Sequence, residues 1–370
     1  MKFSYWEYKE WFSGIDFTVI GSGIVGLSCA LALRKKHAKA KIIILEKGRL
    51  PQGASTKNAG FACVGSLSEL IDDLKTHSET AVFQLVKKRW EGLALLRQHL
   101  GDKNIDYQQH KGYEIFNDAH LYSECMDHQD KVNQLLHPLF KGTVFSEVTN
   151  GFGFKNCHSK QSVNNFEGQL DTGKMMSKLV QLVIEKDIKI INNCNVLQYK
   201  DFGNKVVIQT PFIELETQQL CIATNGFSKQ FLDEDVRPAR AQVLITKPIK
   251  NLHIQGTFHL EKGYYYFRNI HQRILLGGGR NLDFDTEETT VFGETTRIQN
   301  KLKTLLQTTI LPDTPFEIDS NWSGIMGVGN QKKAIVKQIS NRVFCGIRLG
   351  GMGVAIGSLI GEELADLTVY

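Results

Sequence analysis

The stretch that most constrains the fold of this chain lies between residues 16 and 46. An apolar strand leads there into Gly21-x-Gly23-x-x-Gly26, and these glycines open a helix rich in alanine and leucine. Gly21 allows a tight turn, Gly23 lets the backbone approach a pyrophosphate, and Gly26 lets the helix pack closely on the strand. The phosphates of a dinucleotide would then bind at the positive N-terminus of the helix.

The second strand of the same unit supports this interpretation. Residues 42–45 are all apolar, and Glu46 follows them, 20 residues beyond Gly26. At that distance a carboxylate can accept hydrogen bonds from ribose hydroxyls. The alternative, an ordinary βαβ unit with a glycine-rich turn, leaves the position of Glu46 to chance. The sequence therefore predicts a βαβ unit that binds a dinucleotide.

The composition is that of an ordinary soluble protein of about two domains. The chain has 370 residues, of which 42% are hydrophobic and 22% charged. No run approaches the ~20 apolar residues that span a bilayer. Residues 1–12 are aromatic but interrupted by charges, and they lack the apolar core of a signal peptide. We expect them to form a short arm that packs on the body, with a membrane-surface helix as the alternative.

The charge and the cysteines indicate the compartment and exclude some partners. The net charge is +5, and the densest basic run, residues 34–41, ends the first predicted helix, where cations suit the helix dipole. A solvated helix end is therefore expected there, with nucleic-acid binding as the less favoured alternative. The seven cysteines are scattered and include no Cys-x-x-Cys, which favours reduced thiols in the cytoplasm and no metal site.

Three later segments repeat the features of a ligand site. Residues 53–60 form a loop of small and hydrogen-bonding residues that can wrap a polar ligand. An apolar strand at 220–223 ends in Thr224-Asn225-Gly226, which suits the carboxyl edge of a sheet, although a plain turn has the same composition. Another strand leads into the glycines of residues 350–353, which open a terminal helix whose dipole would stabilise negative charge.

With these segments in view, the chain resembles the D-amino acid oxidase superfamily of FAD flavoenzymes, which includes glycine and sarcosine oxidases, D-amino acid dehydrogenases and γ-glutamylputrescine oxidases. The matching stretches occur in the order of that family. They are residues 21–26, 53–60, 223–226, 240–242, 264–268 with 275–278, 322–326 and 350–355.

The resemblance implies an α/β fold in which a Rossmann-like FAD-binding domain is interleaved with an α+β substrate domain built on a mostly antiparallel sheet. The FAD-binding domain would comprise residues 1–89, 150–226 and 321–370. The substrate domain would comprise residues 90–149 and 227–320.

The resemblance also implies which residues contact FAD. The loop at 53–60 and the turn at 350–354 would flank the isoalloxazine, and Val196 would lie beside the adenine. No cysteine occurs in residues 322–326, where some relatives attach the flavin, so noncovalent FAD is expected. The expected contacts are Gly21, Ser22, Gly23, Ile24, Val25, Gly26, Glu46, Lys47, Ser55, Thr56, Asn58, Ala59, Gly60, Val196, Thr224, Asn225, Gly226, Arg348, Gly350, Gly351, Met352, Gly353 and Val354.

The implied activity is oxidation of the C–N bond of a small amino acid or secondary amine by hydride transfer to flavin N5. The imine would be hydrolysed and the electrons passed to oxygen. Arg268 stands where related enzymes grip the substrate carboxylate, although a surface arginine paired with an acid is the alternative. Tyr264 and Tyr266 would share one strand face and line the pocket or pack in the core.

Other activities remain open at this point. Sarcosine-type oxidases place a lysine for the reaction with oxygen near the position of Leu275, and its absence favours a quinone-linked dehydrogenase as the first alternative. The fold also serves as a flavin module that acts on a modified tRNA base. A third alternative is a flavin-binding protein without turnover. The sequence indicates neither the substrate nor the oligomeric state.

Overall fold

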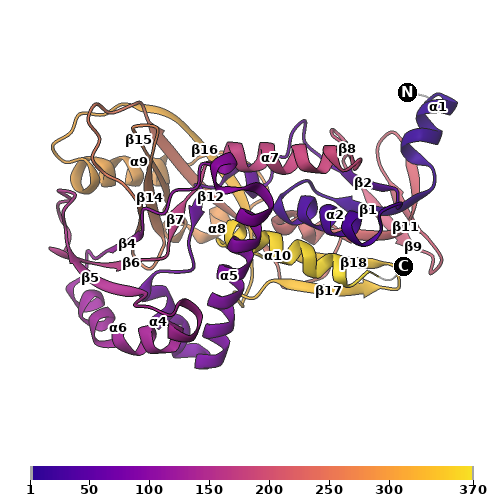
Figure 1. Cartoon of the computed structure of the whole chain (residues 1–370). Coiled ribbons are helices and arrows are strands. Elements are labelled where there is room, and N and C mark those ends of the chain that lie inside the picture. Colours follow the sequence, from indigo (N-terminus) through magenta and orange to yellow (C-terminus); the bar gives the residue numbers. More distant parts are fainter. Residues whose placement is uncertain (1–2, 369–370) are drawn as a thin grey trace.

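The computed structural model describes residues 3–368 and contains two large sheets in neighbouring lobes (Figure 1). The first sheet has the order β17-β18-β11-β1-β2-β8, with β10 and β9 added beside β11. The pairs along β18-β11-β1-β2-β8 are parallel, and the outer pairs are antiparallel. Its strands are β1 (Ile15–Ile20), β2 (Ile42–Leu45), β8 (Lys189–Ile191), β9 (Gln198–Asp201), β10 (Val206–Gln209), β11 (Glu214–Ile222), β17 (Ile335–Ser340) and β18 (Val343–Ile347).

Helices cover this sheet and share one large core with it. The β1 and β2 segments are continuous apolar runs because the parallel strands are buried on both faces. Small residues let the covering helices approach: a Cβ added at Gly361 of α10 would lie 2.6 Å from the Ser28 Cβ of α2. The helices of this layer are α2 (Ile24–Lys36), α5 (Glu79–Leu100), α7 (Thr172–Glu185) and α10 (Gly353–Asp366).

The second sheet has the order β16-β12-β15-β14-β13-β4-β6-β5. All neighbouring pairs are antiparallel except β13 with β4, so the sheet is mostly antiparallel. Its strands are β4 (Gly112–Ile115), β5 (Phe145–Thr149), β6 (Lys160–Asn164), β12 (Arg237–Thr246), β13 (Thr257–Leu260), β14 (Tyr265–Ile270), β15 (Arg273–Gly278) and β16 (Ile318–Val328).

Two apolar clusters support the second sheet. One packs Phe258 and Phe267 against α9 (Thr296–Leu305) and the π-helical turn η5 (Leu306–Ile310). The other joins α4 (Leu67–Thr76), α5 and α6 (Ala119–Phe140), which lie at the lower left of Figure 1. The short elements are α1 (Tyr5–Glu7), η1 (Tyr8–Phe12), α3 (Ala54–Lys57), η2 (Asp102–Ile105), η3 (Asn225–Gln230), η4 (Arg280–Leu282), α8 (Phe284–Glu287), and the strands β3 (Phe61–Ala62) and β7 (Gly168–Gln169), which pair with each other.

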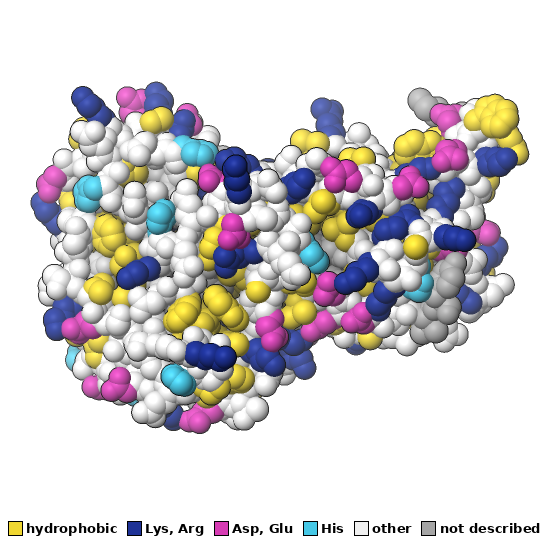
Figure 2. Space-filling view, in the orientation of Figure 1, with side chains coloured by type: hydrophobic (Ala, Val, Ile, Leu, Met, Phe, Trp, Pro, Cys, Tyr) yellow, Lys and Arg dark blue, Asp and Glu magenta, His cyan; other side chains and the backbone are white. Residues whose placement is uncertain are grey.

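The aromatic N-terminal segment is partly anchored and partly exposed. The rings of Phe3 and Phe12 lie 4.8 Å apart, and Phe12 is buried in the body. Tyr5 and Trp6 are 66% and 72% exposed, and Figure 2 shows hydrophobic side chains at the tip of this arm. Met1 and Lys2 lie outside the described residues. Within residues 3–368 no helix combines the length and the apolar character that crossing a membrane requires.

These sheets confirm the predicted fold class, a Rossmann-like unit interleaved with an α+β unit on a mostly antiparallel sheet. The structure distributes two segments differently from the predicted domain division. Residues 160–164 form β6, and residues 321–328 belong to β16, which pairs with β12 along its length. Both segments are hydrogen-bonded into the second sheet, whereas the division assigned them to the FAD-binding domain.

Candidate active site

A cavity of about 550 Å³ lies between the two sheets, at the carboxyl ends of β1, β2 and β11. One side is lined by the turn after β1, by the loop at 52–58 and by the glycines at 350–353. The other side is lined by residues of β12, β14 and the loop after α8. The cavity therefore joins the predicted dinucleotide site to the second sheet, as ligand sites of open α/β sheets do.

The glycine turn after β1 has the geometry that a pyrophosphate requires. Gly21 has a φ of +100°, and a Cβ added at Gly26 would clash with the Gly21 carbonyl oxygen. The backbone N–H of Ile24, at the start of α2, donates to the Ser55 hydroxyl at 2.9 Å. Ser55 Oγ thus accepts a hydrogen bond at the helix N-terminus, where an anion is most stabilised.

Glu46 is buried and held by its own neighbours. One carboxylate oxygen accepts from the backbone N–H and the hydroxyl of Ser22, at 3.0 and 2.6 Å. The other accepts from the Gly48 N–H at 2.9 Å. A carboxylate offers about four acceptor positions, so Glu46 retains capacity for a ribose hydroxyl. The sequence pattern predicted the position of Glu46 at the end of the second strand, but it did not indicate that Ser22 and Gly48 would be its hydrogen-bond donors.

The loop at 53–60 takes its shape from its own side chains. Asn58 donates to the Ser55 carbonyl at 2.6 Å and accepts from the Gly60 N–H at 2.8 Å, while Thr56 donates to the Pro51 carbonyl at 2.7 Å. Of the residues predicted here, Ser55 and Asn58 line the cavity, whereas Thr56, Ala59 and Gly60 do not. Of these three residues, Thr56 and Gly60 stabilise the loop through the hydrogen bonds just described.

The C-terminal glycines present bare backbone to the cavity. A Cβ added at Gly350 or Gly351 would have no atom within 4 Å, so a ligand can approach the main chain there. Arg348 supports the turn from behind, with NH1 2.8 Å from the carboxylate of Asp235. Asn225 Oδ1 accepts from the Leu349 N–H at 3.2 Å and thereby links this turn to the end of β11.

The remaining residues predicted to contact FAD also separate into residues that line the cavity and residues that do not. The cavity is lined by Gly21, Ser22, Gly23, Ile24, Val25, Glu46, Lys47, Val196, Thr224, Asn225, Gly350, Gly351, Gly353 and Val354, whereas Gly26, Gly226, Arg348 and Met352 do not line it. Thr224 Oγ1 is buried without a hydrogen-bond partner in the described part of the chain. Such a group is stabilised when a ligand supplies the partner.

The predicted substrate residues occupy three different environments. Tyr266 lines the cavity, and burial raises its pKa to about 12. Tyr264 is 41% exposed, packs beside Phe284 and does not line the cavity. Arg268 is 3% exposed and lies just behind the cavity, with NH2 3.0 Å from the position of a Cβ on Gly60.

Arg268 is a buried cation without a close counter-ion. Among residues 3–368 no carboxylate lies within ion-pair distance of its guanidinium, and Nε has no hydrogen-bond partner. Burial lowers its pKa to about 10, and the charges of Asp171 and Asp106 partly offset this effect. An unpaired buried guanidinium is costly in free energy, so the site favours an anionic ligand.

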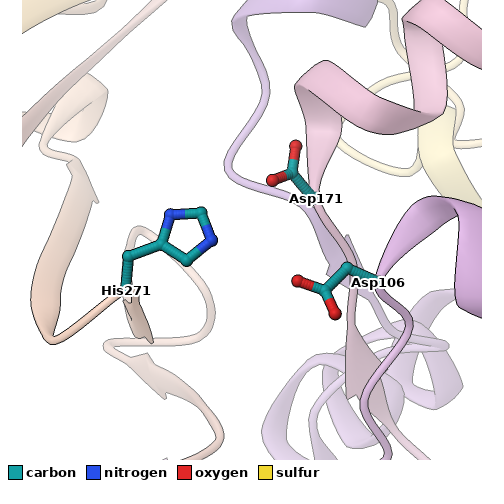
Figure 3. Close-up of side chains that lie close together, drawn as sticks. All are labelled: Asp106, Asp171 and His271. Atoms are coloured by element: carbon teal, nitrogen blue, oxygen red, sulfur yellow. The ribbon is translucent and has the colours of Figure 1, made fainter.

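Asp106, Asp171 and His271 lie together near this arginine. Figure 3 shows the two carboxylates facing the imidazole of His271, which comes from the turn between β14 and β15; the potential ligand atoms lie within 4.8 Å of one another. Asp171 caps α7 by accepting from the Lys174 N–H at 2.9 Å, and Lys174 Nζ lies 3.4 Å from Asp106. The ammonium group of Lys174 therefore offsets part of the negative charge of the two carboxylates.

A buried polar layer lies behind the cavity wall. The Phe61 ring lies between Tyr266 and His259, with ring centroids 5.5 and 5.2 Å away, and His259 Nε2 is 3.9 Å from Glu167. Burial lowers the pKa of His259 and raises that of Glu167 to about 8. Burial also raises the pKa of Glu114 to about 7.

The wall contributed by the second sheet was not predicted from sequence, apart from Tyr266. Ala241 and Val243 of β12 and the loop residues Thr290, Val291 and Phe292 line it. Alternation along β12 puts Ala241 and Val243 on one face, but a single sequence does not reveal which face meets the cavity. The loop carries no motif that marks it.

Known proteins share this architecture. Residues 16–367 match the protein family described as FAD dependent oxidoreductase. The chain is 20% identical over 368 residues to the probable oxidoreductase OrdL of Haemophilus influenzae. This alignment covers 95% of this chain and 82% of OrdL. Glycine oxidase from Geobacillus kaustophilus superposes with a TM-score of 0.77 at 16% identity, over 95% of this chain and 94% of that one. L-Proline dehydrogenase from P. horikoshii superposes with a TM-score of 0.75 at 16% identity, over 95% of this chain and 92% of that one.

Proposed function

The chain belongs to the family of FAD-dependent oxidoreductases, and on that premise we propose that it oxidises the C–N bond of a small amino acid or secondary amine. The observation that carries this proposal is the unpaired, buried guanidinium of Arg268 beside a cavity that begins at a dinucleotide-binding turn. A carboxylate-bearing amine would supply the missing anion.

The residues of the cavity fit FAD. The open backbone at Gly350 and Gly351, the start of α2 and the unpartnered hydroxyl of Thr224 together offer donors to phosphate and ring oxygens. When bound, FAD would accept a hydride at N5 from the carbon beside the substrate nitrogen. Cys194 lines the cavity, but burial raises its pKa to about 12, so the thiol stays protonated; this supports noncovalent binding.

The chain's own groups would bind and orient the substrate. Arg268 would grip the carboxylate, and the neutral hydroxyl of Tyr266 would donate a hydrogen bond at the cavity wall. Loss of a hydride from the carbon of the neutral amine leaves an iminium cation, which water hydrolyses after release to a carbonyl compound and ammonia or an amine. The protein's task is then to hold the reacting carbon ~3–3.5 Å from the acceptor atom.

The electron acceptor is proposed to be oxygen, with a quinone as the alternative. Leu275, at the position considered for an oxygen-reactive lysine, is buried and pairs with Arg268 across β14 and β15. An apolar side chain there supports the dehydrogenase alternative. All seven cysteines are free thiols, in keeping with the cytoplasmic location proposed from sequence.

Anaerobic reduction of the purified holoprotein by glycine, sarcosine, proline, D-amino acids and polyamine derivatives tests the proposal. Bleaching of the flavin band by one of them, reversed quickly by air with peroxide formed, is the result expected of an oxidase. Slow reversal by air and rapid reversal by a quinone would assign the dehydrogenase alternative. A flavin that none of these compounds reduces would overturn the proposal.

A further inference from the structure

The substrate side of the cavity has an apolar platform. Val243 pairs with Gly277, and Gly277 pairs with Tyr266, so the three residues form one row across the second sheet. Because Gly277 has no side chain, the Tyr266 ring and the Val243 methyl close over it: a Cβ there would lie 2.6 Å from each. Val243 and Tyr266 therefore present a continuous hydrocarbon surface to the cavity.

Arg268 stands next to this platform. It follows Tyr266 by two residues on β14, so both side chains project from the same face of the strand, about 7 Å apart along it. The charged lining residues of the cavity, Glu46, Lys47 and Lys57, come from the side of the first sheet. The part of the wall formed by the second sheet thus combines one neighbouring cation with uncharged side chains.

A fixed loop contributes further apolar side chains to the lining of the cavity. Val291 and Phe292 line the cavity although they are 66% and 38% exposed. The loop is anchored on both sides, since Arg240 donates to the Val291 carbonyl at 3.3 Å and Ser323 Oγ accepts from the Gly293 N–H at 2.8 Å. Large apolar side chains held in water are stabilised when a ligand covers them.

The anchor of this loop leaves Arg240 unable to bind a substrate anion. Its guanidinium donates to both carboxylate oxygens of Glu287, at 2.8 and 2.9 Å, and Gln242 donates to the same carboxylate at 2.9 Å. Glu287 is fully buried. Arg240 therefore holds the loop and is not available to a substrate carboxylate, whereas Arg268 has no ion-pair partner in the part of the chain that the structure describes.

We propose that the substrate is an amino acid whose only charged groups are its amine and its carboxylate, and that its hydrocarbon substituent packs between Val243 and Phe292. This inference rests on the proposed function and narrows it. Each methylene covered by the platform is expected to raise kcat/KM about fourfold. A second charge on the substituent has no partner on this wall and is expected to lower kcat/KM on the order of 100-fold.

A homologous series tests the inference with two independent readouts. Reduction rates would be measured for glycine, alanine, 2-aminobutyrate and norvaline in both configurations, for the N-methyl to N-propyl glycines, and for aspartate and ornithine. Non-reacting carboxylates from acetate to pentanoate would be titrated into the oxidised holoprotein and followed by the flavin absorbance. We expect Kd to fall about fourfold with each methylene.

A matched pair of variants locates the effect. Phe292→Ala should weaken pentanoate binding about tenfold and leave acetate within about twofold, because only the longer chain reaches the loop. Phe284→Ala is the control, since Phe284 is 44% exposed in the same region but does not line the cavity; its series should match that of the unmodified protein.

The outcomes separate this inference from the proposed function. If amines reduce the flavin but glycine, aspartate or ornithine is preferred, or the series is flat, the inference is wrong and the proposed function stands. Equal effects of the two alanine variants would also overturn it. If no amine reduces the flavin, both fail together.

Discussion

On the side of the first sheet, Glu46 is held by residues of its own βαβ unit and the turn that follows it, whereas the opposite wall of the cavity is assembled from distant segments. Glu46 is fixed by Gly48 and by the turn that the sequence motif itself contains. The wall with Val243 and Phe292 depends on strand register and on a loop anchored through Arg240. A motif can encode the first kind of site, while the second is a property of the whole fold.

The largest effect on stability and flavin binding is expected from a substitution in the glycine turn after β1. Gly26→Ala would push a methyl group into the Gly21 carbonyl, which is backbone and cannot move aside. We expect a loss of about 3 kcal/mol or more in the free energy of unfolding, and protein that purifies without flavin. Gly151→Ala is the control, because a Cβ there meets nothing within 4 Å and the residue does not line the cavity. Retained flavin in the Gly26 variant would show that the close packing is not required.

Substitution of Arg268 tests whether the wall formed by the second sheet binds the substrate carboxylate. Arg268→Met should lower kcat/KM for carboxylate-bearing amines about 100-fold while the oxidised flavin spectrum stays normal. The same variant should act on the corresponding amine without a carboxylate almost as well as the unmodified protein does. An equal loss with both compounds would assign Arg268 a structural role.

The polar layer behind the wall predicts a pH dependence of stability. In the folded protein, burial raises the pKa of Glu167 to about 8 from its ordinary value of 4.5. The unfolded state therefore releases this proton at lower pH, and the free energy of unfolding should fall as the pH rises from about 5 to about 8. Urea titrations across that range should show a smaller fall for Glu167→Gln, by roughly 1–3 kcal/mol. Glu91→Gln, at an exposed site on α5, should keep the full dependence.

A smaller effect on FAD binding is expected at Glu46, because several donors hold its carboxylate. Ser22→Ala removes one of three hydrogen bonds to Glu46 and keeps the two from backbone N–H groups. We expect FAD to bind about tenfold more weakly, a cost of about 1–2 kcal/mol, measured by fluorescence titration of the apoprotein. An unchanged Kd would indicate that the backbone donors alone position the carboxylate.

The same contrast explains how far the sequence could predict this protein. The βαβ unit and the position of Glu46 follow from local spacing, and the resemblance to a flavoenzyme family supplied the fold class that the structure confirms. Tyr264 was grouped with Tyr266 by strand alternation, but β14 begins at Tyr265, so Tyr264 lies in the preceding turn and is exposed. Phe292 carries no local signal, because its place depends on the buried pair of Arg240 and Glu287.

The order of strands in the first sheet also has a consequence for synthesis. β1 and β2 leave the ribosome early, but β11, the other neighbour of β1, follows much later, and β18 and α10 later still. The nascent chain must keep an apolar βαβ unit without its lateral partners until then. Cofactor loading is therefore expected after the C-terminal helix emerges, and the edge of β1 that later pairs with β11 is where chaperones would be needed.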